Sequence, residues 1–351
     1  MQRTMNEQTK RLRHSSDEEP GYTRKRIGRA WAYFDEHGER VTNRDEIDRL
    51  NAIALPPAYT NAWFCKDANG HLQATGRDAR GRKQYRYHPG FRSKRDASKY
   101  EGCLEFGQAL PRLRGRVERD LKRRKLDRET VLAAVVRLLD REHIRVGNEE
   151  YARANKSFGL TTLRDRHVKR HGARLKMRFP GKHGVVHEAT ITDRNLKRVV
   201  KKCQDLPGQM LFQYVNGDGN PQAVTSADVN DYIRAATGAD FTAKHFRTWG
   251  ASVIFFKQML GKADERRLSL KTALEPVAEA LGNTLAISRK SYVHPLLIET
   301  LQDDPRDPLN GFEAPPSRRR LTAAETAFLA FLKKMSRGAR RASRTARKPT
   351  A

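Results

Sequence analysis

The spacing of apolar residues changes near residue 92, so the two parts of the chain must fold differently. From about residue 26 to 92, apolar and polar residues alternate in short runs between turn signals such as Asp67–Gly70 and Gly81. Beyond this point, apolar residues recur every three to four positions over long stretches. We therefore expect a small β-rich N-terminal domain and a larger, mostly α-helical domain, which is an α+β fold.

The N-terminal part predicts several short strands and one helix. RIGRAWAYFDEHGERVT is typical of two strands around an EHG turn, and two further turns follow in DANG and RDARG. NRDEIDRLNAI, between the first two turns, favours a short helix. We place this β-rich domain at residues 21–92, after a polar and flexible arm of residues 1–20.

The following domain, residues 93–315, shows helical periodicity and helix boundaries. Asp127 is a plausible N-cap for ETVLAAVVRLLDRE, Ser226 caps ADVNDYIRAAT, and Gly238 ends that second helix. One segment breaks the helical pattern, because ARLKMRF and VVHEATI alternate on both sides of PGKHG. This pattern predicts a β-hairpin that carries Lys182 at or near its tip.

The end of the chain predicts one more helix and a basic tail. TAAETAFLAFLKKM is amphipathic and begins with a Thr322/Glu325 capping box, within a helical segment at residues 316–335. Residues 336–351 are rich in arginine and lysine, and we expect a disordered tail that contacts phosphates without reading sequence.

The charge of the chain indicates a polyanionic partner. The 351 residues carry a net charge of +29, for which nucleic acid is the commonest partner, although a basic soluble protein or an anionic membrane would also fit. No apolar run approaches 18 residues, so we expect no membrane span. The three cysteines lack the spacing of a zinc site and suit a reducing cytoplasm, where we place the chain with the nucleoid.

Four stretches of the second domain contain residues that could act on phosphate. They are IRVGNEEYA with Arg145, PGKHG with Lys182, KHFRTWG with Arg247, and GNTLAISRKSY with Asn283 and Tyr292. Each has an ordinary explanation when taken alone. An arginine can cap helix carbonyls, a turn lysine is usually solvated, and a tyrosine is usually packed.

In this order, the four stretches resemble the type IB DNA topoisomerases, in the compact branch of poxviruses and bacteria. The resemblance covers about residues 22 to 300, and GRDARGRKQYRYH looks like the DNA-contacting β-domain of the family. It implies an enzyme that relaxes supercoiled duplex DNA by transient cleavage of one strand. The family does so through a covalent 3′-phosphotyrosine, strand rotation and religation, without ATP, metal or other cofactor.

The resemblance also implies a role for each candidate residue. Tyr292 would be the nucleophile that forms the covalent intermediate. Arg145 and Arg247 would clamp the nonbridging phosphate oxygens, for which the planar, always charged guanidinium is well suited. Lys182 would protonate the departing 5′-oxygen as general acid.

Asn283 occupies the position, nine residues before the tyrosine, where the family usually has histidine. An asparagine amide can donate a hydrogen bond to a phosphate oxygen, but it cannot carry a proton near neutral pH. We therefore expect Asn283 to act as a donor and not as an acid. His294 is another possible source of a proton, and an ordinary loop histidine is the alternative explanation.

The resemblance also implies DNA contacts in the N-terminal domain. Alternation along the strand places Tyr85 and Tyr87 on one face and Gln84 on the other. The alternative is that the tyrosines are core and the cations are solvated. The candidate DNA-binding residues are Arg82, Lys83, Gln84, Tyr85 and Tyr87. We expect a monomer whose two domains clamp double-stranded DNA, mostly through phosphates.

Two alternatives to a topoisomerase are open to test. A tyrosine recombinase would share the arginine, lysine and tyrosine chemistry, but recombinases usually have a histidine where this chain has Lys244, and a helical N-terminal domain. A non-catalytic DNA-binding protein would fit the charge, but it would not require Arg145, Lys182, Arg247 and Tyr292 together.

Overall fold

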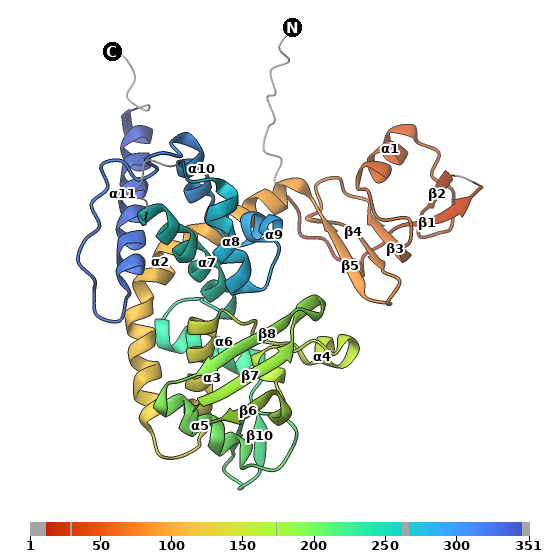
Figure 1. Cartoon of the computed structure of the whole chain (residues 1–351). Coiled ribbons are helices and arrows are strands. Elements are labelled where there is room, and N and C mark those ends of the chain that lie inside the picture. The colour runs from red at the N-terminus through yellow and green to blue at the C-terminus, as the bar shows by residue number, and fades with distance from the viewer. Residues whose placement is uncertain (1–11, 29, 173, 262–266, 346–351) are drawn as a thin grey trace. The chain divides into compact units, whose positions relative to one another are not determined.

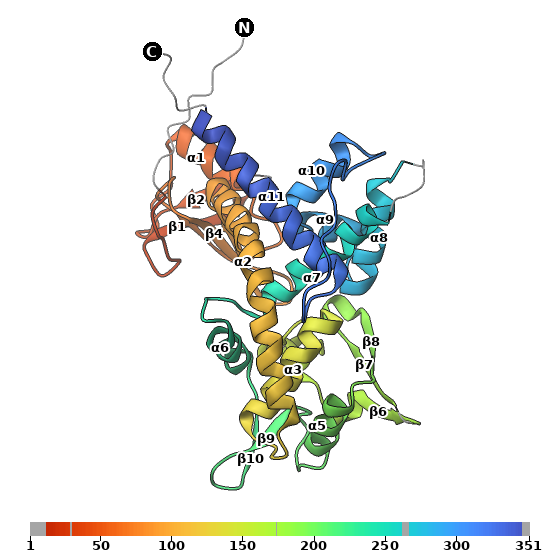
Figure 2. The ribbon, with the colours of Figure 1, turned by 90° about the vertical axis from the view of Figure 1, so that its left-hand side faces the viewer.

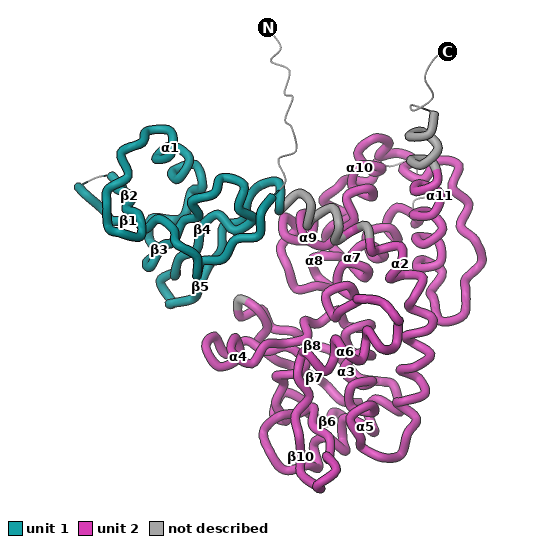
Figure 3. Tube along the Cα trace, turned by 180° about the vertical axis from the view of Figure 1, so that it is seen from behind, with its two compact units in different colours: residues 1–99 teal, residues 100–351 magenta. Residues whose placement is uncertain are grey.

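The computed structural model describes residues 12–28, 30–172, 174–261 and 267–345, and its elements are shown in Figure 1. The chain divides into two compact units, residues 1–99 and 100–351, which Figure 3 shows in different colours. An antiparallel sheet dominates the first unit and helices dominate the second, so the predicted α+β class is confirmed. No helix in the described part of the chain is long and apolar enough to cross a membrane.

The first unit is a five-stranded antiparallel sheet in the order β2-β1-β3-β4-β5, with one helix. Its elements are β1 Gly21–Ile27, β2 Ala30–Phe34, α1 Arg44–Ala52, β3 Thr60–Cys65, β4 Leu72–Arg77 and β5 Lys83–Tyr87. A small core of Tyr33, Leu50, Phe64 and Ala74 fills the space between helix and sheet. The predicted helix and the turns at Asp67–Gly70 and Gly81 are confirmed.

The first hairpin lies earlier in the sequence than predicted. Strands β1 and β2 join at Gly28, whose positive φ of 61° suits a residue without a side chain. The EHG turn follows β2 and returns the chain only to an isolated bridge between Phe34 and Arg40. The predicted turn at EHG is therefore present, but the strand predicted after it is reduced to a single bridge at Arg40.

The expected flexible arm is wrong for residues 12–20, while residues 1–11 lie outside the described residues. The Ser15 hydroxyl donates to the Leu72 carbonyl at 3.0 Å and accepts from the Leu72 N–H at 3.1 Å. Asp17 accepts from the Thr75 hydroxyl at 3.0 Å and pairs with Lys83 at 2.5 Å. This polar stretch is therefore bound along β4 and β5 by side-chain hydrogen bonds.

The second unit is mostly helical and contains two small sheets. Its helices are α2 Pro89–Lys122, which begins before the unit boundary, α3 Arg128–Glu142, α4 Glu149–Asn155, α5 Arg194–Gln204, α6 Ser226–Thr237, α7 Ala243–Leu260, α8 Leu270–Leu281, α9 Leu285–Ser291, α10 Pro295–Asp303 and α11 Ala323–Thr345. The core centres on α3, which is buried from Thr130 to Leu139, and on α7. Apolar residues on nearly every face of α3 explain why other elements surround it.

Helix boundaries follow the sequence closely, with one shift. Asp127 caps α3, since its carboxylate accepts from the Thr130 N–H at 3.0 Å, and Gly238 ends α6 with a φ of 72°. The N-cap of α6 is Thr225 and not Ser226. Thr225 is favoured as the N-cap because Asp228, three residues later, forms a capping box with it.

The predicted hairpin is confirmed, and it belongs to a three-stranded sheet in the order β6-β7-β8. The strands are β6 Val168–His171, β7 Arg174–Pro180 and β8 Val186–Ile191, and a separate pair is β9 Gln213–Val215 with β10 Pro221–Ala223. Leu175, Met177 and Phe179 point into the core, as the alternation predicts. The short β6 was not predicted, because its four residues carry little periodic signal.

Helix α11 lies beside α2 (Figure 2) and begins with the predicted capping box between Thr322 and Glu325. It continues to Thr345, so the expectation of disorder is wrong for residues 336–345, while residues 346–351 lie outside the described part. Alanine and arginine in this segment favour helix, whatever the charge.

Glu325 also connects three helices in the interior. Its carboxylate accepts from Arg114 of α2 at 2.7 and 2.9 Å and from the Trp249 indole N–H of α7 at 3.1 Å. Arg114 pairs in addition with Asp140 of α3 at 2.8 Å. The carboxylate is therefore both the cap of α11 and the partner of a largely buried cation.

We expect Glu325→Ala to lower the free energy of unfolding by roughly 2–4 kcal/mol, because it leaves Arg114 with only one carboxylate in a buried setting. Glu275→Ala is the control, since Glu275 forms an exposed pair with Lys271 at 3.9 Å, and it should cost less than about 0.5 kcal/mol. Denaturant unfolding followed by circular dichroism checks both. Equal, small effects would show that the buried network contributes little.

Candidate active site

The site is organised by a buried arginine on α7. Arg247 is only 4% exposed, and its guanidinium donates hydrogen bonds to two backbone carbonyls. One is the carbonyl of His143, the C-cap of α3, and the other, at 3.0 Å, is that of Leu281, the last residue of α8. Helix carboxyl ends carry partial negative charge, so both are suitable partners for a cation.

Each carbonyl lies two residues before another candidate. Arg145 follows His143, and Asn283 follows Leu281, and the Arg145 guanidinium donates to the Asn283 Oδ1 at 2.9 Å. The chain turns sharply at both helix ends, with φ of 50° at His143 and 59° at Gly282. Arg247 therefore holds the ends of α3 and α8, and the residues that follow these ends, Arg145 and Asn283, contact each other.

Tyr292 ends helix α9, and its ring faces the same arginine. The Arg247 guanidinium carbon lies 4.8 Å from the ring centroid, within cation–π range. Ser252 of α7 holds the backbone on both sides, because its hydroxyl contacts the Tyr292 carbonyl at 3.4 Å and accepts from the His294 N–H at 3.0 Å.

The electrostatics favour the ionised form of the Tyr292 phenol. Burial raises the pKa of Tyr292, but the positive charges of Arg247 and Arg145 outweigh burial and lower that pKa overall. Burial, with the neighbouring Arg145, lowers the pKa of Arg247 to about 10, so this arginine remains charged at neutral pH.

Two buried donors of the site lack a hydrogen-bond partner among the described residues. They are the amide nitrogen Nδ2 of Asn283 and the Nε of Arg247. Leaving a buried donor unpaired costs about 1–3 kcal/mol, so such groups need an explanation. An anionic oxygen from a bound phosphate would supply the missing acceptor for both.

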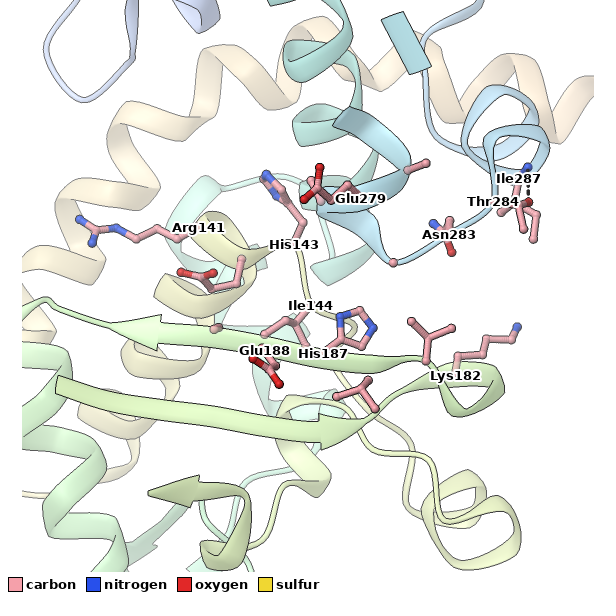
Figure 4. Close-up of a pocket in the computed structure, with 17 residues that line it drawn as sticks. Arg141, His143, Ile144, Lys182, His187, Glu188, Glu279, Asn283, Thr284 and Ile287 are labelled. Carbon is pink, nitrogen blue, oxygen red and sulfur yellow. Dashed lines mark hydrogen bonds between the residues drawn. The ribbon is translucent and has the colours of Figure 1, made fainter. Parts of the chain in front are cut away.

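Lys182 lies across a cavity from Asn283. It belongs to the short 3-10 turn Lys182–Gly184 between β7 and β8, and its side chain is exposed. Lys182 and Asn283 line one cavity of about 770 Å³. Figure 4 shows the residues that line it. Within the described residues, no hydrogen bond or ion pair joins Lys182 to the other four candidates.

Two histidines near the site were missed by the sequence reasoning. His143 supplies the carbonyl for Arg247, and His187 of β8 lines the cavity with Lys182 and Asn283. The role of His143 is invisible in a sequence, because it uses the backbone. The motif GKHGVVHE did contain His187, so its position five residues after Lys182 was the available signal.

His294 has a structural role. It is the N-cap of α10, where its Nδ1 accepts from the Leu296 N–H at 3.2 Å, and its ring packs on Tyr100 with centroids 5.3 Å apart. Burial lowers the pKa of His294 to about 4. A neutral ring that is used as a cap is a poor proton donor, which weighs against a catalytic role.

In the first unit, the cations expected to contact DNA already have acidic partners. Arg82 pairs with Asp78 at 2.7 Å, and Lys83 pairs with Asp17 at 2.5 Å. The Gln84 amide also donates to Asp78, at 3.1 Å. A phosphate contact through these side chains would require exchange of existing partners.

The two tyrosines of β5 lie on one face, as the alternation predicted. The rings of Tyr85 and Tyr87 stack with centroids 6.1 Å apart, and Tyr85 is 46% exposed. Tyr87 is half-buried, so the ring of Tyr85 is the exposed aromatic surface that this edge strand offers to bases.

Comparisons with known proteins identify the family of the chain. Residues 88–307 match the sequence model of the catalytic core of eukaryotic DNA topoisomerase I. Residues 30–78 match the model of the N-terminal domain of bacterial DNA topoisomerase IB. Together these two matches include parts of both units.

Two similar individual proteins are both named DNA topoisomerase 1B. DNA topoisomerase 1B of Acanthamoeba polyphaga mimivirus is 34% identical over 285 residues, which cover 78% of this chain and 84% of the relative. DNA topoisomerase 1B of vaccinia virus (strain Copenhagen) is 23% identical over 255 residues, covering 70% of this chain and 76% of the relative.

Among solved structures, the XerH site-specific recombinase bound to its difH substrate is similar over 55% of this chain and 52% of that chain. The TM-score is 0.34 and the identity 14%, which is too low to indicate a common function. The family matches and the mimivirus relative decide the assignment. The chain belongs to the type IB DNA topoisomerases.

Proposed function

We propose that this chain relaxes supercoiled duplex DNA by a reversible transesterification at Tyr292. The observation that carries the proposal is that buried Arg247 faces the Tyr292 ring and holds the helix ends from which Arg145 and Asn283 meet each other. Two unpaired donors in this group support it, because they fit the oxygens of a phosphodiester.

The reaction breaks one bond and forms one bond at phosphorus. The phenolic oxygen of Tyr292 attacks the phosphorus and loses its proton to water, and the bond from phosphorus to the 5′-oxygen breaks. Lys182 donates a proton to that oxygen, so it leaves as a hydroxyl instead of an alkoxide. The DNA 3′-phosphate stays on the tyrosine, and the 5′-hydroxyl reverses the steps after strand rotation.

The arginines supply the electrostatic part of the barrier reduction. Negative charge grows on the nonbridging oxygens during attack, and Arg145, Arg247 and Asn283 offer donors that are already fixed in place. Removing one such preorganised donor typically slows a reaction by about 100- to 1000-fold. No ATP or metal ion enters any of these steps.

One protomer is sufficient for this chemistry. The five residues with proposed roles all lie in the second unit of a single chain, between Arg145 and Tyr292. We propose that the first unit adds contacts to the same duplex through Gln84 and the exposed Tyr85, and that the enzyme acts as a monomer on nucleoid DNA.

Tyr292→Phe should abolish relaxation of a negatively supercoiled plasmid in EDTA without ATP, because the nucleophilic oxygen is gone while the ring over Arg247 remains. Gel electrophoresis of the plasmid, with a denaturing gel for the covalent adduct, is the measurement. Tyr59→Phe, in the first unit, controls for loss of a hydroxyl and should keep full activity. Relaxation by Tyr292→Phe would place the nucleophile elsewhere.

Asn283→Ala should slow single-turnover cleavage by about 100-fold, as expected for loss of one preorganised donor. Asn283→Asp should be at least as slow, because it keeps an acceptor for Arg145 but presents negative charge to the phosphate. The control is Asn310→Ala, at an exposed position. A full cleavage rate for Asn283→Ala would exclude the donor role.

Lys182→Ala should slow cleavage of an ordinary phosphodiester by about 100- to 10,000-fold, the usual range for a general acid. The loss should shrink on a substrate with a 5′-bridging sulfur, because a thiol of pKa about 8.5 leaves without a proton. Lys176→Ala, at an exposed position on β7, is the matched control. An equal loss on both substrates would contradict the general-acid role.

A further inference from the structure

The His187 ring lies between the two segments that carry Lys182 and Asn283. Strand β8 holds His187 opposite Phe179, and the two rings stack with centroids 5.5 Å apart. In Figure 4, the His187 ring rises from the strand toward the segment of Asn283, with Lys182 on the same hairpin. All three side chains line one cavity.

Two glycines make room for this ring, and each directly precedes one of the candidate residues. A Cβ atom at Gly181 would lie 2.4 Å from the Cδ2 of His187, and Gly181 precedes Lys182. A Cβ atom at Gly282 would lie 2.7 Å from the Cε1 of His187, and Gly282 precedes Asn283. Both approaches are closer than any real Cβ contact, so the ring touches the backbone on both sides.

Both contacts lie at the Nε2 end of the ring, because Nε2 is the second-nearest ring atom to each Cβ position, at 2.7 Å from Gly181 and 3.1 Å from Gly282. Cδ2 faces the hairpin turn, and Cε1 faces the end of α8. The Nε2 end of the imidazole therefore lies between the two backbones and limits how closely they approach. A smaller side chain would leave both segments free to approach or to separate, since close packing is what fixes such distances.

We propose that His187 is a positioning residue, whose ring is a spacer between Gly181 and Gly282 that sets the separation of Lys182 from Asn283. This inference rests on the proposed roles of Lys182 and Asn283. It assigns His187 no contact with the DNA. Burial, Arg145 and Arg247 lower the pKa of His187, so the spacer adds no charge to the site at neutral pH.

The spacer model predicts that ring shape matters and imidazole chemistry does not. His187→Ala should slow single-turnover cleavage on the order of 100-fold, the loss expected when reacting groups are misplaced by about 1 Å. His187→Phe should recover most of the rate, because it keeps a planar ring on Phe179. His187→Gln, with polar atoms but no ring, should stay slow.

A second test uses the collision at Gly181. Gly181→Ala should slow cleavage because its new methyl group meets the His187 ring, while its φ of −90° suits alanine. Adding His187→Ala removes the ring, so the double variant should cleave faster than Gly181→Ala alone. Such mutual relief would show that the His187 ring and the Gly181 backbone are in contact, as the spacer model requires.

The substrate with a 5′-bridging sulfur tests the link to Lys182. The defect of His187→Ala should shrink on this substrate, as for Lys182→Ala. Thermal melting and DNA affinity, measured for every variant, separate misplacement from unfolding. Wild-type rates in His187→Ala, or recovery by His187→Gln and not by His187→Phe, would overturn the spacer model.

Failure of the proposed function looks different. If wild-type enzyme forms no adduct, or if Tyr292→Phe still cleaves DNA, the transesterification at Tyr292 is wrong whatever the His187 variants do. If cleavage requires Tyr292 but is unaffected in His187→Ala, only the spacer model is wrong.

Discussion

The site depends on the hydrogen bonds from the buried Arg247 guanidinium to two backbone carbonyls. A cation removed from water needs partners, and Arg247 finds them in carbonyls at the ends of α3 and α8. Those carbonyls precede Arg145 and Asn283 by two residues each, so satisfying the cation also places both side chains. The contacts that stabilise the buried cation are therefore the same contacts that position the proposed phosphate-binding side chains.

A consequence of this construction is that the proposed phosphate donors are held in place by other residues of the chain. Arg145 and Asn283 hold each other at 2.9 Å, Ser252 holds the backbone around Tyr292, and His187 fills the space before Lys182. Donors that are already in place need no reorganisation during the reaction, which is the main source of electrostatic catalysis. Lys182 lies at the exposed turn between β7 and β8.

Local signals in the sequence predicted most helices and strands, whereas contacts between residues far apart in the sequence were not predicted. The caps at Asp127 and Glu325 and the hairpin around Lys182 each depend on neighbouring residues, and each was found. The backbone carbonyls that hold Arg247 and the glycines around His187 carry no side-chain signature. The same limit explains residues 12–20, whose polar composition hides the hydrogen bonds that bind them to the sheet.

Two histidines beside the site, His143 and His187, have lowered pKa values, and this bears on the asparagine at position 283. Burial, with Arg247 among its neighbours, lowers the pKa of His143, and burial with Arg145 and Arg247 lowers that of His187. Both imidazoles are therefore neutral at neutral pH, and the Asn283 amide cannot titrate. Cations thus surround a phenol whose own pKa is lowered. A histidine at position 283 would add a group that titrates near neutral pH, whereas an amide adds no charge to the field on Tyr292.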